Sequence, residues 1–183
     1  MAAKTLYGAP AKEVTHANYT ADALWKEIRA AEARGDMIMV GSPSTPSGSH
    51  NESQANGIAY NHAFTLLGTK EVIDSGRNKI KLLKIRNPWG SEAYKGDFSD
   101  KSKAWTVDLR KQAGNVIKDD GEFFIPLKDF MTSFSETSLN FNTKGMSRSH
   151  FLVLDDANKH TRQGETCEGT CSYHKFTIKS ATT

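Results

Sequence analysis

The hydrophobic pattern of the chain predicts one amphipathic helix near the start of the sequence. Residues 20–35, TADALWKEIRAAEARG, carry three apolar side chains at helical spacing on one face: Leu24, Ile28 and Ala31. Thr20 is a residue type that caps the first turn of a helix, and Gly35 is one that ends a helix in a left-handed conformation. A short apolar run, MIMVG at residues 37–41, follows as a predicted buried strand.

Two longer runs, IAYNHAFTLLG and KIKLLKIRN, predict a pair of antiparallel strands. A hairpin folded between Asp74 and Ser75 sorts both strands into one apolar and one solvent-tolerant face. Its expected pairs on the apolar face are Leu66 with Leu83, Phe64 with Ile85 and His62 with Asn87. On the other face it pairs Thr65 with Lys84 and Ala63 with Arg86. A bulge in either strand would shift this register by one residue.

The rest of the chain predicts loops, one more strand and a short helix. Residues 42–57, SPSTPSGSHNESQANG, have the composition of a surface loop. DDGEFFIPLKDFMTSF predicts a strand followed by a short helix. From residue 149 onward two short β-type runs, HFLVLDD and KFTIKS, lie beyond this main domain. The pattern as a whole predicts the α+β class.

Composition changes the picture mainly by exclusion. The 183 residues are 37% hydrophobic and 25% charged with a net charge of +3, which suits a soluble globular protein. The basic residues are scattered without interleaved aromatics, so nucleic-acid binding is not expected. No apolar run approaches the roughly 20 residues of a membrane helix and no signal-peptide pattern is seen, so a cytoplasmic location is expected.

The cysteines do not point to a site. Cys167 and Cys171 lie in CEGTC with His174 nearby, but four ligands at zinc-type spacing are not present. We interpret them as two reduced thiols near a turn, and neither a metal site nor a secreted disulfide framework is predicted.

The pairing of His62 with Asn87 has a specific chemical use. An asparagine carbonyl can accept a hydrogen bond from one imidazole N–H, which fixes the tautomer and presents the other nitrogen to a nucleophile. For a cysteine nucleophile, a neutral amide orients the imidazolium without neutralising it. Trp89, just past Pro88, would cover this hydrogen bond. On the residues alone the alternative stays open: a strand-end histidine, a turn asparagine and a core tryptophan.

Several segments in the same order resemble the second half of the protease core of calpains, which are papain-like, calcium-regulated cysteine endopeptidases. RNPWG carries the resemblance, together with NHAFTLLG before it and SDKSKAWT and DDGEFFIPLKDF after it, from about Gly8 to about Phe134. The resemblance implies that His62 and Asn87 are catalytic and that Trp89 shields them. It also implies a mainly antiparallel sheet with one N-terminal helix over residues 1–145, and the opening of a β-sandwich domain over residues 146–183.

The departures from the family pattern limit what the chain is expected to do. The family's nucleophilic cysteine stands in a Gln-Gly-x-x-Gly-Asp-Cys-Trp context that is absent here, and neither Cys167 nor Cys171 has that context. The chain is therefore expected to be the histidine half, inactive alone, whose partners are the cysteine-bearing first subdomain and protein substrates. The alternative is a calpain-like regulatory or scaffold protein without activity. Residues 42–57 either border the substrate path or form an idle surface loop.

The resemblance also implies a calcium site. The matching ligands are Asp100, Asp120 and Glu122, with the Lys118 carbonyl as a backbone ligand. A further family glutamate falls at Ala93, next to Glu92, and this loss would weaken calcium binding without excluding it. A solvated acidic loop is an equally weighted alternative. In the tail, RQGETCEGTC falls where the family has a glycine-rich turn. The strands there would have unpaired edges, so disorder, packing back on the core or pairing with a second molecule is expected.

Overall fold

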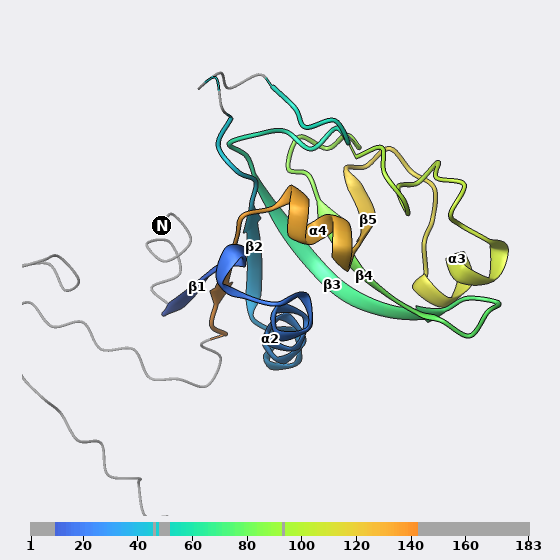
Figure 1. Ribbon diagram of the computed structural model, residues 1–183, viewed down its shortest axis with the longest axis horizontal. Helices are drawn as coiled ribbons and strands as arrows, with labels where there is room; N and C mark the ends of the chain where they lie inside the picture. Colours follow the sequence, from blue (N-terminus) through green and yellow to red (C-terminus); the bar gives the residue numbers. More distant parts are fainter. Residues whose placement is uncertain (1–9, 46, 48–51, 93, 143–183) are drawn as a thin grey trace, which may run out of the picture. The chain divides into compact units, whose positions relative to one another are not determined.

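The computed structural model describes residues 10–45, 47, 52–92 and 94–142, and these form an antiparallel sheet with helices on it (Figure 1). The strand order is β1-β6-β2-β3-β4-β5, and every neighbouring pair is antiparallel. The strands are β1 (Ala11–Thr15), β2 (Met37–Gly41), β3 (Ala63–Ile73), β4 (Lys79–Arg86), β5 (Glu122–Pro126) and β6 (Glu136–Asn140). The α+β class and the mainly antiparallel sheet are confirmed.

The helices begin and end where local chemistry favours it. In α2 (Ala21–Arg34), Thr20 Oγ1 accepts a hydrogen bond from the N–H of Ala23, and Gly35 ends the helix with φ of 73°, as expected. The short helix α4 (Leu127–Ser133) follows β5, also as expected. A turn of 3-10 helix, η1 (His16–Asn18), links β1 to α2.

A third helix, α3 (Val107–Ala113), was not predicted. It lies in a polar stretch, and its only apolar side chains that become buried are Leu109 and Ala113. Two local signals were nevertheless present: Thr106 accepts a hydrogen bond from the N–H of Leu109, and the helix stops at Gly114, where φ is 71°. The N-terminal helix and the short helix after β5 were both predicted, and α3 adds a third helix to them.

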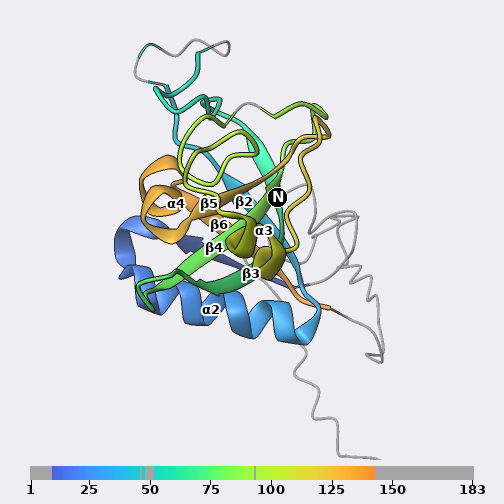
Figure 2. The same cartoon turned by 90° about the vertical axis from the view of Figure 1, so that its right-hand side faces the viewer.

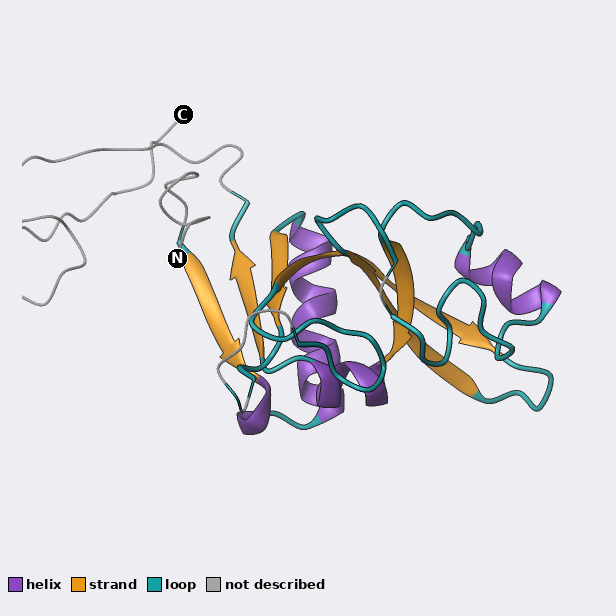
Figure 3. Ribbon diagram, turned by 90° about the horizontal axis from the view of Figure 1, so that it is seen from above, coloured by secondary structure: helices purple, strands orange, loops and turns teal. Residues whose placement is uncertain are grey.

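Alternate side chains of the central strands enter two separate hydrophobic clusters, because successive residues of a strand point to opposite faces. Leu83 and Ile85 belong to the larger cluster, which α2 and α4 cover, as the ribbon seen from the side also shows (Figure 2). Leu82 belongs to the smaller cluster on the other face, which α3 covers. Figure 3 shows α3 at the far end of the long β3–β4 hairpin. There Gln112 exchanges two hydrogen bonds with the backbone of Ile73.

The predicted register of this hairpin is wrong. Near its open end Leu66 lies opposite Ile85, not Leu83, and Thr65 lies opposite Arg86, not Lys84. The expected pairs of Phe64 with Ile85 and Ala63 with Arg86 are displaced in the same way, whereas His62 and Asn87 lie just outside the paired strands. Two features cause this: the turn runs from Asp74 to Asn78, later than expected, and a bulge between Leu66 and Gly68 changes the register. Because the displacement at the open end is two residues, each side chain keeps its predicted face.

Several expectations fall on residues outside the described part. These are the β-sandwich opening at 146–183, both cysteines, residues 46 and 48–51 of the predicted loop, and Ala93. Within the described residues, no helix is long and apolar enough to cross a membrane.

Candidate active site

The open end of the β3–β4 hairpin brings His62 and Asn87 together. His62 immediately precedes β3 and Asn87 immediately follows β4, so the two residues lie at the same end of these neighbouring strands. His62 Nε2 lies 3.0 Å from Asn87 Oδ1. Asn87 is fully buried, whereas His62 is partly exposed. The pair therefore combines a sheltered amide with an imidazole that solvent or another molecule can reach.

Two further hydrogen bonds determine which end of the Asn87 amide faces the imidazole. Asn87 Nδ2 donates to the carbonyl of Ser91 at 3.2 Å, and Asn87 Oδ1 accepts from the N–H of Trp89 at 3.1 Å. With the amide so oriented, only the oxygen can face His62, and Nε2 must therefore carry the proton. His62 Nδ1 is then the nitrogen with the free lone pair, which is the form of the ring that acts as a base.

Aromatic rings enclose His62 on two sides. The ring of Trp89 stacks on the imidazole with centroids 4.1 Å apart and an interplanar angle of 29°. The ring of Phe64 meets it edge-on at 4.6 Å. Trp89 is 62% exposed, so it is not a core residue and its main contact in the site is the imidazole. Trp89 thus covers one face of the imidazole.

A tight backbone contact holds the Asn87 side of the site, and the sequence did not reveal it. The N–H of Asn87 donates to the carbonyl of Gly121 at 2.8 Å. Gly121 has a φ of 81°, and a Cβ atom there would lie 2.7 Å from Asn87 O and 3.1 Å from Gly90 Cα. The Asp-Gly-Glu segment was singled out for its charges, but its glycine is what allows the two loops to touch.

The predicted calcium ligands lie around this same loop, and Asp100 is the most buried of them. It is only 3% exposed, and its Oδ2 accepts from the N–H of Lys118 at 2.9 Å. Its own N–H donates to Glu92 Oε1 at 2.8 Å. Burial raises the pKa of the Asp100 carboxyl, and the nearby Asp120 carboxylate adds to this. Burial likewise raises the pKa of Glu92.

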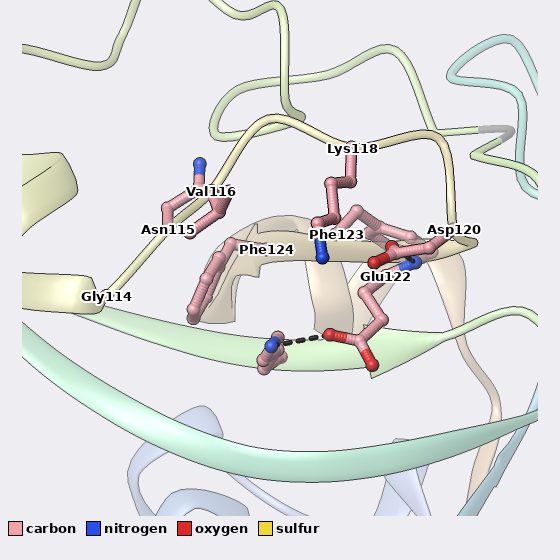
Figure 4. A pocket seen from close by; sticks show the side chains of 9 residues that line it. Gly114, Asn115, Val116, Lys118, Asp120, Glu122, Phe123 and Phe124 are labelled. Carbon is pink, nitrogen blue, oxygen red and sulfur yellow. Dashed lines mark hydrogen bonds and ion pairs between the residues drawn. The ribbon is translucent and has the colours of Figure 1, made fainter.

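The other predicted ligands have protein partners. Asp120 Oδ1 accepts from the N–H of Glu122 at 3.0 Å, and the Glu122 carboxylate forms an ion pair with Lys84 at 2.6 Å. Figure 4 shows Lys118, Asp120 and Glu122 around a cavity of about 160 Å³, with Glu122 directed to its lysine partner. The part of the chain that the structure describes contains no group of three or more His, Cys, Asp or Glu arranged to hold a metal ion. In this side-chain arrangement the predicted ligands do not form a calcium site.

The sequence is similar to a known family of proteins over the residues that form this site. Residues 1–140 match the family model described as calpain family cysteine protease. The chain is 37% identical to calpain-9 of Mus musculus over 116 residues, which are 61% of this chain and 16% of that protein. It is 41% identical to human calpain-14 over 81 residues, 43% of this chain and 12% of that protein. With human calpain-8 it shares 28% identity over 155 residues, 82% of this chain and 22% of that protein.

The aligned parts thus span between 12% and 22% of the length of these relatives. The family match, by contrast, extends over most of this chain and includes every described strand and helix as well as both members of the hydrogen-bonded pair. The chain belongs to the calpain family of cysteine proteases.

Proposed function

We propose that this chain supplies the histidine and asparagine of a calpain-type cysteine endopeptidase, while the nucleophilic thiol comes from the cysteine-bearing first core subdomain. The observation that supports this most directly is the oriented pair: Asn87 Oδ1 accepts from His62 Nε2, which leaves Nδ1 as the base. Neither cysteine of the sequence has the family's Gln-Gly-x-x-Gly-Asp-Cys-Trp context. For this reason the chain by itself is proposed to be inactive.

In this proposal His62 performs two proton transfers. Its Nδ1 takes the proton of the thiol, and the resulting thiolate attacks the scissile carbonyl of a protein substrate. The same nitrogen then gives that proton to the leaving amine. Throughout, Nε2–H keeps its bond to Asn87. Because the amide is neutral, it holds the imidazolium in position without neutralising the charge that stabilises the thiolate.

The test combines the chain with the missing half. The chain and a separately produced cysteine-bearing first core subdomain of its parent are mixed, and cleavage of a fluorogenic peptide is followed. We expect turnover from the mixture and none from either part. His62→Ala is expected to abolish the turnover of the mixture. The matched control is His16→Gln. His16 is a histidine in η1, which follows the edge strand β1 and not the β3–β4 hairpin that carries the site. Cleavage by the chain alone, or activity that survives His62→Ala, would contradict the proposal.

An inactive regulatory or scaffold role is the second candidate, because no thiol in the family context is present in this chain. The same experiment separates the two. A mixture that forms a stable complex without cleaving the peptide, although the added subdomain has its cysteine, would favour the scaffold role.

We include calcium binding in the proposal on the condition that the side chains of the predicted ligands rearrange. The carboxylates of Asp100, Asp120 and Glu122 follow the family positions, and calcium requires roughly six to eight oxygen ligands. Glu122 would first have to leave Lys84. Isothermal titration calorimetry with calcium chloride tests this: heat that saturates below millimolar calcium and that Asp120→Asn removes would support binding. The absence of binding heat at millimolar calcium would show that these carboxylates form a solvated acidic loop and not a calcium site.

A further inference from the structure

The antiparallel ladder between β2 and β3 continues past both strand ends to Ser42 and His62. The last pair within the strands is Gly41 with Ala63. One step further, the N–H of Ser42 donates to the carbonyl of His62 at 3.0 Å. One step beyond that, the N–H of Asn61 donates to the carbonyl of Pro43 at 3.0 Å. The backbone of His62 is thus still part of the sheet, although the residue itself belongs to no strand.

At this pair the Ser42 side chain adds hydrogen bonds to the one that the Ser42 backbone N–H makes with His62. The N–H of His62 donates to Ser42 Oγ at 2.9 Å, and Ser42 Oγ in turn donates to the carbonyl of His62 at 3.1 Å. A hydroxyl has one donor and two acceptor positions, so both bonds can exist at once. Ser42 is 8% exposed. This nearly buried hydroxyl therefore forms hydrogen bonds with both the N–H and the carbonyl of His62.

We propose that Ser42 is a positioning residue for His62, an inference that rests on the proposed function of the histidine. The imidazole is held at two points: Asn87 binds the tip of the ring, and Ser42 binds the backbone from which the side chain extends. Asn61, just before the histidine, has a φ of 50°, a left-handed conformation that asparagine tolerates. Without the Ser42 hydroxyl, the backbone N–H of His62 would lose its hydrogen-bond acceptor.

The control comes from a second serine at the same strand end. Ser135 Oγ donates to the carbonyl of Gly41 at 3.3 Å, directly beside Ser42. That carbonyl also accepts the N–H of Ser135 at 2.9 Å. Ser135→Ala therefore removes a hydroxyl of the same kind, one residue away, but leaves the carbonyl hydrogen-bonded. This variant separates the effect of losing any serine hydroxyl in this region from the effect of losing the hydroxyl that binds His62.

The experiment is nuclear magnetic resonance of the isolated chain with ¹⁵N-labelled histidine. In the parent chain we expect two well-separated ring nitrogen resonances for His62, with the proton on Nε2. In Ser42→Ala we expect these resonances to move toward each other. We also expect the backbone N–H of His62 to exchange with solvent about fivefold faster or more, which corresponds to the loss of one typical hydrogen bond. Ser135→Ala and the conservative Ser42→Thr, which retains the hydroxyl, should resemble the parent chain.

Unchanged ring resonances and exchange in a folded Ser42→Ala chain would overturn the proposal. If Ser42→Ala does not fold, Ser42→Cys replaces it, because a thiol has a similar size but is a much weaker hydrogen-bond partner. The same shifts are then expected, and their absence counts against the proposal in the same way.

A second readout uses the assembled protease. In the mixture with the cysteine-bearing subdomain, Ser42→Ala should lower kcat about tenfold with little change in KM, since ring orientation affects the proton transfers rather than substrate binding. A mixture without any activity would refute the proposed function, whereas the imidazole measurement on the chain alone would still decide the role of Ser42.

Discussion

Replacing Asn87 by alanine is the perturbation that most directly tests the architecture of the site. The side chain is fully buried and takes part in three hydrogen bonds, to His62, to the N–H of Trp89 and to the carbonyl of Ser91. At about 1 kcal/mol for each net hydrogen bond, the loss is about 3 kcal/mol. Trp89 and Ser91 lie at the surface, where water can replace part of the bonding. We therefore expect a loss of roughly 2–3 kcal/mol in the free energy of unfolding.

The assay is urea and thermal unfolding followed by tryptophan fluorescence and circular dichroism. For a chain of this size, such a loss corresponds to a fall in Tm of about 5–10 °C. The matched control is Asn115→Ala. Within the described residues, Asn115 Nδ2 is one of the buried polar atoms without a hydrogen-bond partner. Its removal should change the free energy of unfolding by no more than about 0.5 kcal/mol. Equal losses in the two variants would show that the hydrogen bonds of Asn87 contribute nothing special.

Three further predictions concern other parts of the fold. Gly121→Ala should destabilise by about 2 kcal/mol or more in urea unfolding, because the new methyl group would meet the backbone of Asn87. Gly114→Ala, at a similar φ but with no atom within 4 Å, should lose only about 1 kcal/mol, and equal losses would contradict the steric argument. Burial lowers the pKa of His16 from 6.5 to about 4. The unfolded chain therefore binds a proton at a higher pH than the folded chain does. For this reason the free energy of unfolding should be greatest above pH 6.5 and should fall as the pH drops from 6.5 to 4. The variant His16→Phe should flatten that part of the pH profile, and an unchanged slope would assign it to other groups. Trp89→Ala should change stability by less than about 1 kcal/mol, since the ring is largely exposed, but should speed solvent exchange of the imidazole Nε2 proton; unaltered exchange would show that the ring does not shield the site.

The features that depend on near neighbours along the chain could be predicted from the sequence alone. The helix of residues 21–34 follows from its apolar spacing, from the Thr20 cap and from the left-handed stop at Gly35. The face on which the side chains at the open end of β3 and β4 lie, before the bulge, follows from the two-residue period of a strand. That is why His62 and Asn87 could be expected to meet even though the predicted pairs within the two strands were displaced.

Tertiary structure decided what depends on residues far apart in the sequence. A two-residue period does not fix where a hairpin turns or where a bulge enters, so the Asp74–Asn78 turn and the irregularity at Leu66 and Gly68 could not be read from the pattern. The same holds for the contact of Gly121 with Asn87, because a glycine in a turn shows no sign of what it approaches. Hydrogen bonds between distant segments form only when the sheet order brings the segments together, and no local pattern records that order.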